Sequence, residues 1–163
     1  MLKLYKEHSA QFHNPADLQT YCFGGRGVVT LHNPVTNVHH TYYIKKPQNE
    51  DEFPQDVYFV YAVHVAEGIN KCFYIGMIEQ GKFRLTRASR YATHTAIVKG
   101  ANYLMRMMHD IKAFRKMNVY HEGMCSVCGR PLTSPKSLNR GIGPKCWAYL
   151  QDVAPWEGLE AAE

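Results

Sequence analysis

One stretch near the C-terminus reads HEGMCSVCGRPLTSPKSLNRGIGPKCW and covers residues 121–147. Two residues separate Cys125 from Cys128 in it, which lets one tight turn direct both sulfurs at a single tetrahedral ion. Gly129 follows at once, where such a turn often needs a residue that is free to adopt positive φ. The spacing therefore predicts a zinc knuckle.

A third thiol, Cys146, lies farther along the same stretch, two residues after Pro144. Proline is suited to the first position of a helix, and Ala148 to Leu150 can continue that helix. Cys146 would then lie in a first helical turn, where the helix dipole favours a thiolate. A knuckle, a short hairpin and a ligand at a helix start together predict a treble-clef arrangement.

The fourth ligand has to come from another residue type, and His121 is the nearest candidate because it precedes Cys125 by four residues. Zinc held by His121, Cys125, Cys128 and Cys146 would be a closed structural site without an open position for catalysis. A redox pair is the less favoured alternative, because such pairs usually follow a strand of a βαβ unit, which this sequence lacks. The alternative of buried free thiols stays open.

The same residues resemble a small zinc-binding domain of unknown function that is found in many bacteriophage and bacterial proteins. The pattern of that domain is H-x-G-x-C-x-x-C-G-R-x-L-T, then S, then G-x-G-P-x-C. The positions of this chain that match it are His121, Cys125–Thr133, Ser137 and Gly141–Cys146. Upstream, four short segments resemble the sheet region that often precedes that domain. They are Tyr74–Gly76, Phe83–Arg87, Ser89-Arg90 and Val98-Lys99. The resemblance implies a treble-clef-like zinc site, but it carries no activity that can be transferred.

Upstream of the zinc stretch, the pattern predicts an α+β fold. The segments with β-forming or alternating residues are 28–32, 38–45, 57–65, 72–78 and 83–86. They predict an antiparallel sheet of about five strands. A short capped helix is expected over Asn14–Gln19, and one long helix from Thr93 to about Arg115 is expected to pack on the sheet.

The chain has 163 residues, of which 45% are hydrophobic and 20% charged, as in an ordinary globular protein. We expect a sheet-plus-helix domain over residues 1–116, a zinc module over 117–150 and an acidic, frayed tail over 151–163. No apolar run is long enough to span a membrane, and the N-terminus lacks the apolar core of a signal peptide. Three cysteines in a metal-type cluster favour a reducing cytoplasm.

Charge is distributed unevenly along the chain. Residues 1–80 have a net charge of −2, residues 81–146 have a net charge of +11, and residues 147–163 hold four acids and no base. A basic segment of this kind predicts a polyanionic partner, although a solvated basic face is the simpler alternative. The residues expected to contact nucleic acid are Lys82, Arg84, Arg87, Arg90, Tyr91, Arg130 and Arg140. Tyr91 is expected to stack on an unpaired base.

Catalysis is not expected. The sequence contains no phosphate-binding loop ending in Lys-Ser/Thr and no zinc-deaminase pattern, and its acids are sparse. The favoured function is therefore a small phage-type zinc-binding accessory protein that contacts nucleic acid without catalysis. The alternative is a phage-encoded factor that binds a host protein and inhibits or redirects a host enzyme or defence system.

Overall fold

The structure of the protein is a computed structural model that describes residues 10–49, 52–53 and 56–153. Its elements, in chain order, are α1 (Pro15–Cys22), β1 (Arg26–His32), β2 (His39–Lys45), β3 (Val57–Ala66), β4 (Ile69–Glu79), β5 (Lys82–Arg84), α2 (Ala96–Met107), α3 (Ile111–Lys116), β6 (Asn118–His121), α4 (Pro135–Arg140) and α5 (Pro144–Val153). The expected mixture of helices and strands is confirmed. Residues 154–163, most of the predicted tail, lie outside the described residues.

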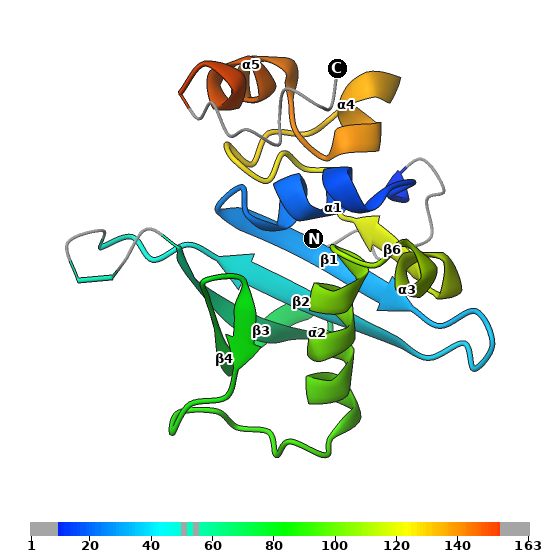
Figure 1. Cartoon of the computed structure of the whole chain (residues 1–163), viewed down its shortest axis with the longest axis vertical. Helices are drawn as coiled ribbons and strands as arrows, with labels where there is room; N and C mark the ends of the chain where they lie inside the picture. Colours follow the sequence, from blue (N-terminus) through cyan, green and yellow to red (C-terminus); the bar gives the residue numbers. More distant parts are fainter. Residues whose placement is uncertain (1–9, 50–51, 54–55, 154–163) are drawn as a thin grey trace.

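The strands form one curled antiparallel sheet in the order β5-β4-β3-β2-β1-β6 (Figure 1). The first five strands are the antiparallel strands that the sequence predicted, and they follow the chain as one meander. The sixth strand, β6, was not predicted, because it is short and lies at the start of the zinc stretch. It returns after α3 to pair with the free edge of β1, with Val29 opposite His121. The module predicted over residues 117–150 thus begins with a strand of the main sheet.

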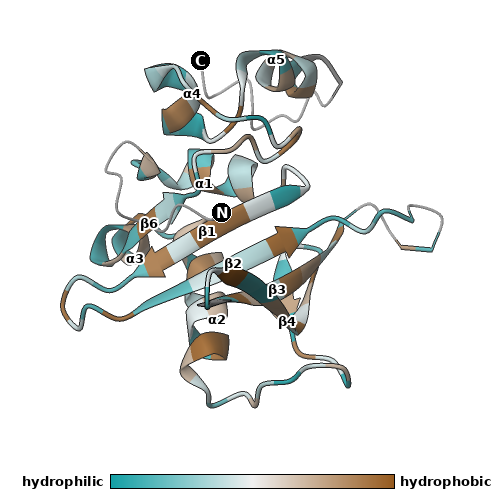
Figure 2. Cartoon of the chain, turned by 180° about the vertical axis from the view of Figure 1, so that it is seen from behind, coloured by the Kyte–Doolittle hydropathy of each residue, from teal (hydrophilic) through white to brown (hydrophobic). Residues whose placement is uncertain are grey.

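One face of the sheet carries the hydrophobic core. Alternate residues of the central strands point to this face, because successive side chains of a strand project to opposite sides. The inward residues include Val29, Leu31, Tyr42, Ile44, Val60 and Ala62, and they pack against apolar residues of α1, α2 and α3. Figure 1 shows α2 lying across the strands, and in the reverse view of Figure 2 the strands β2 and β3 lie in front of α2.

The prediction of a single long helix to about Arg115 is wrong, because two helices occupy that segment. The amides of His109 and Asp110 both donate to the Arg106 carbonyl, and α2 ends there. The Asp110 carboxylate then accepts hydrogen bonds from the amides of Lys112 and Ala113 and begins α3. An N-cap of this kind competes with continuation of the preceding helix.

None of the helices within the described ranges is long and apolar enough to cross a membrane.

Candidate metal centre

Three cysteines converge at the C-terminal end of the fold. The sulfur atoms of Cys125, Cys128 and Cys146 all lie within 4.8 Å of one another, and none of them is in a disulfide. Cys125 and Cys128 flank the turn that follows β6, and Cys146 lies in the first turn of α5, as predicted. Sulfurs that approach from two separate segments in this way could hold a metal ion through their thiolates.

Local backbone geometry creates the knuckle. The Gly129 amide donates to the Cys125 carbonyl (2.9 Å) with Gly129 at φ 78°, a conformation that favours glycine. The Cys125 amide donates to the Arg130 carbonyl, and Met124 forms an isolated β-bridge with Pro131. These contacts close a short hairpin around the knuckle, whereas the sequence predicted a hairpin between the knuckle and the helix.

The Cys125 sulfur lies in an environment that favours a thiolate. Burial alone would raise its pKa, but the backbone amides of Cys128, Gly143 and Val127 donate to the sulfur and bring the pKa below its usual value. The Gly143 nitrogen lies 3.4 Å from the sulfur. The backbone of the knuckle is therefore already arranged around an anionic sulfur ligand.

The pKa of the Cys146 thiol is shifted in the opposite direction, upward. Burial, followed by the nearby sulfurs of Cys128 and Cys125, raises the pKa of the Cys146 thiol to about 12. Three sulfurs at this separation repel one another when they are all deprotonated, and a divalent cation between them removes that penalty. The donor set thus fits a soft, thiolate-preferring ion such as Zn²⁺.

The predicted fourth ligand, His121, lies outside this group. Its position opposite Val29 turns the imidazole into the core, where it contacts the rings of Phe12 and Tyr21 with centroid distances of 5.2 and 5.5 Å. Nδ1 accepts a hydrogen bond from the Gly123 amide (2.9 Å), which places the proton on Nε2, and Nε2 donates to the Leu138 carbonyl. Both ring nitrogens are therefore occupied by backbone partners.

The cluster is held tightly against the rest of the fold. The Ser126 amide donates to the Gly141 carbonyl, and the Arg26 amide donates to the Ser126 carbonyl, which ties the knuckle to β1. Gly141 packs against the ring of Tyr21, so that no side chain could be added there without displacing that ring. The sequence carried no signal for the contacts of Arg26 with Ser126 and of Tyr21 with Gly141, because each joins residues that are distant in the chain.

The basic residues predicted to contact nucleic acid fall into two groups. Lys82 and Arg84 lie on β5 at one edge of the sheet, with Arg87, Arg90 and Tyr91 in the connection to α2. The second group, Arg130 and Arg140, lies beyond β6 at the other edge. Six strands at about 4.8 Å spacing separate the two edges by roughly 24 Å, and Figure 1 shows the connection before α2 at the opposite end of the molecule from α4 and α5. They do not form one continuous track.

Several of these side chains already have partners. Arg84 forms an ion pair with Glu79 (3.1 Å), and the Arg90 guanidinium lies 5.8 Å from the centroid of the Phe73 ring. Tyr91 packs against the core, and its hydroxyl is bonded to His64. In the metal module, the Arg140 guanidinium stacks over the Trp147 ring at 4.3 Å and is held in place by that contact.

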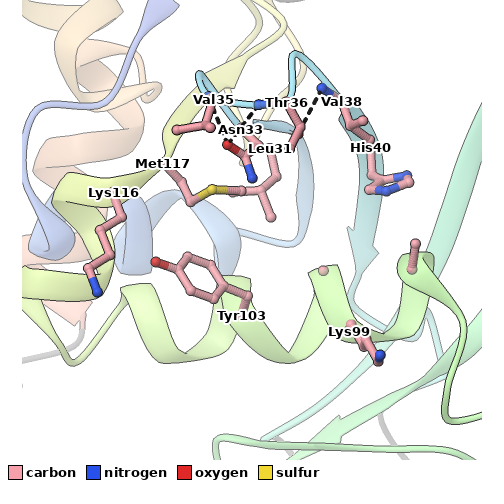
Figure 3. Close-up of a pocket in the computed structure, with 12 residues that line it drawn as sticks. Leu31, Asn33, Val35, Thr36, Val38, His40, Lys99, Tyr103, Lys116 and Met117 are labelled. Atoms are coloured by element: carbon pink, nitrogen blue, oxygen red, sulfur yellow. Dashed lines mark hydrogen bonds between the residues drawn. The ribbon is translucent and has the colours of Figure 1, made fainter.

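An apolar groove lies away from the cysteines. It has a volume of about 890 Å³ and is formed by the β1–β2 turn, the first half of α2 and the end of α3 (Figure 3). Val35 and Val38 of the turn are 89% and 51% exposed, and Lys99 and Lys116 also line the groove. Of the predicted module, residues 117–150, only Met117 is among the residues that line this groove.

Comparison with known families gives one match. A model of a family of unknown function, DUF6011, matches residues 116–151, which span β6, the knuckle, the hairpin, α4 and most of α5. No curated protein matches the chain, and no solved structure matches it. The match agrees with the resemblance seen in the zinc stretch, and it assigns no activity to the cysteine cluster.

Proposed function

We propose that this protein is a zinc-binding accessory protein that contacts nucleic acid through the basic surface of its metal module and has no catalytic activity. The observation that carries the proposal is the charge of that module. After Glu122, which is the one acid of residues 117–150, residues 123–151 contain four cations and neither Asp nor Glu. The cations are Arg130, Lys136, Arg140 and Lys145.

Zinc is supported by the three converging thiols and by the amides that donate to the Cys125 sulfur. In this proposal Cys125, Cys128 and Cys146 hold the ion, and the ion holds the knuckle against the start of α5. For His121 to complete the tetrahedron, one of its ring nitrogens would have to give up its hydrogen bond to Gly123 or Leu138 and reach the sulfurs. We therefore propose that the fourth ligand is a group outside the described residues, which keeps the site closed and non-catalytic.

Contact with nucleic acid is supported by the kind of side chains that the module presents. Arg130, Lys136 and Lys145 are exposed and have no ion-pair partner among the described residues, and Arg140 is preorganised by its stacking on Trp147. Tyr149, on the same helix as Trp147, is 59% exposed. Arginine and lysine bind phosphates, and exposed aromatic rings stack on bases, so this surface suits a polynucleotide.

The test is binding of labelled oligonucleotides, followed by fluorescence anisotropy at two or more salt concentrations. The dependence of log K on log salt should have a negative slope, and Arg130→Gln or Arg140→Gln should each reduce that slope by about one unit. Arg115→Gln is the matched control, because Arg115 is an exposed arginine outside the module, on α3. Failure of the wild type to bind any oligonucleotide more tightly than about 10⁻⁴ M at physiological salt refutes the proposal.

A protein-binding factor directed at a host enzyme or defence system is the second candidate, and the groove of Figure 3 is the observation that favours it. Its lining is mostly apolar, and its two lysines have no ion-pair partner within the described residues. Such a groove fits an apolar peptide segment flanked by carboxylates. Val35→Asp should then abolish a complex that survives nuclease treatment, whereas Arg130→Gln should leave it intact.

A further inference from the structure

The second face of the sheet carries a cluster of aromatic rings that the core does not use. Tyr43 of β2 is paired directly with Tyr61 of β3, and Tyr61 is paired with Tyr74 of β4. Phe59 lies two residues before Tyr61 on the same side of β3. All four side chains are half-buried, and none of them belongs to the core or to the apolar side chains packed against it. We call these four residues the aromatic face.

A β-bulge is needed to assemble this face. From Val57 to Val60 the register of β3 and β4 is regular, and Val60 lies opposite Gly76. The register then shifts by one residue, so that Tyr61 lies opposite Tyr74 and not opposite Ile75. Ile75 is fully buried in the core as a result. The bulge thus directs Tyr74 to the same side as Tyr43 and Tyr61, which is a common use of such bulges.

The rings form a continuous cluster in which neighbours are tilted, by 43° between Tyr43 and Tyr61 and by 71° between Tyr61 and Tyr74. The centroid distance is 6.1 Å between Tyr43 and Tyr61, 5.8 Å between Tyr61 and Tyr74, and 6.1 Å between Phe59 and Tyr74. Figure 2 shows the sheet from this side, with β2 and β3 in front of α2. Cross-strand aromatic pairs stabilise a sheet by about 0.2–1 kcal/mol each. That stabilisation does not by itself explain why four rings stay partly exposed on the face that no helix covers.

Cations accompany the rings. Arg26 of β1 is paired with Lys45 of β2, and Lys45 is paired with Phe59, so both cations project from the side of the sheet that carries the aromatic face. The Arg26 guanidinium also reaches the Cys128 carbonyl (3.5 Å), which joins this surface to the metal module. The acids near this surface include Glu122, whose carboxyl has its pKa raised by burial, and Glu52, which neighbours the Phe53 ring that packs on Phe59. Arg26 and Lys45 are the cations that can contact an anionic ligand here.

We propose that the aromatic face binds single-stranded nucleic acid by base stacking, with Arg26 and Lys45 contacting its phosphates. This inference rests on the proposed function, since it identifies the class of nucleic acid that the protein binds. Single strands are favoured because the flat faces of bases are available to tyrosine and phenylalanine rings only when the bases are unpaired and splayed out. Arg26 lies between the rings and the basic metal module, so one strand can contact both surfaces.

The test compares Tyr61→Leu and Tyr74→Leu with Tyr58→Leu in binding to single-stranded and duplex oligonucleotides. Tyr58 is the matched control, because it is a half-buried tyrosine of the same strand whose hydroxyl donates to the Phe23 carbonyl on the core side. Each change on the aromatic face should weaken single-strand binding by roughly 5- to 150-fold, the equivalent of one lost stacking contact. Duplex binding and the salt slope should stay the same.

Photocrosslinking of the wild type gives a second measurement that no folding defect can obscure. A single-stranded oligonucleotide containing 4-thiouracil should crosslink to peptides that contain Tyr43, Tyr61 or Tyr74. If Tyr61→Leu and Tyr74→Leu remain folded and bind single strands like the wild type, the aromatic face is not the binding surface, whereas the metal module can still be. If the wild type binds no oligonucleotide, the proposed function fails together with this inference.

Discussion

His121 shows how one side chain can match a ligand pattern and still lie elsewhere. Its spacing from Cys125 suits a zinc ligand, but its place in β6 turns the imidazole toward Phe12 and Tyr21. Burial lowers the pKa of this histidine, so the ring is held neutral with one proton on Nε2. A neutral imidazole with a carbonyl and an amide as partners is a structural group that fixes the start of the knuckle.

We therefore expect opposite results from two substitutions. Cys128→Ser should abolish stoichiometric zinc binding, because it removes one of three thiolates. His121→Ala should retain about one zinc per chain and should lower the stability of the fold by roughly 1–3 kcal/mol, because it leaves buried backbone groups unpaired. Elemental analysis and thermal unfolding measure the two effects.

Cys72→Ser is the control for this comparison, since Cys72 is an exposed thiol on β4, far along the chain from the cluster. It should change neither zinc content nor stability appreciably. Loss of zinc from His121→Ala as complete as that from Cys128→Ser would show that the histidine is a ligand after all.

Gly100 offers a second test, on α2. Replacing an interior helical glycine by alanine usually stabilises a helix by about 0.5–1 kcal/mol. Here the added Cβ would meet the Tyr42 hydroxyl, which is fully buried and donates to the Ile97 carbonyl (2.7 Å). Gly100→Ala should therefore lower the melting temperature, and Tyr42→Phe in the same chain should recover part of the loss.

The break between α2 and α3 depends on a single cap. Asp110 accepts hydrogen bonds from the amides of Lys112 and Ala113, and the Ala113 amide is the main cause of the low pKa of the Asp110 carboxyl. Because the pKa is depressed in the folded state, this carboxylate stabilises the fold above its unfolded pKa, and the effect is lost as pH falls through the folded value.

Asp110→Ala should accordingly speed hydrogen exchange of the α3 amides at neutral pH, while the amides of β3 keep their protection. Asp110→Asn should change exchange much less, because asparagine is also a good N-cap. Equal exchange in the wild type and Asp110→Ala would mean that the cap does not define the start of α3.

Over the whole molecule, the metal module is attached to the sheet by contacts that do not depend on the proposed ion. The module begins with β6, which pairs with β1, and Ile142 and Gly141 are buried against the body of the fold. The sheet and α2 have their own apolar core. Removal of the ion should therefore loosen the knuckle and α5 without unfolding the sheet.

Hydrogen exchange after treatment with a zinc chelator measures this directly. Amides of residues 123–151 should lose protection, whereas those of β2, β3 and β4 should keep it, and adding Zn²⁺ should restore the original pattern. A single cooperative loss of protection across all strands would show that the ion stabilises the entire fold and not only its last third.

The amino-acid sequence by itself determined the features that depend on neighbouring residues. The alternation of apolar and polar residues predicted strands β1 to β4, because side chains of a strand project to alternate sides. The Cys125-x-x-Cys128-Gly129 spacing likewise predicted the knuckle, whose turn closes within five residues. Pro144 predicted the start of α5 for the same reason.

Only the tertiary structure decided the features that join distant segments. The pairing of β6 with β1 took His121 out of the cluster, and the bulge opposite Val60 and Tyr61 brought Tyr74 into line with Tyr43. The order of the strands also placed the two basic groups at opposite edges of the sheet. These outcomes depend on register and strand order, which are set by packing between residues far apart in the chain and leave no local pattern in the sequence.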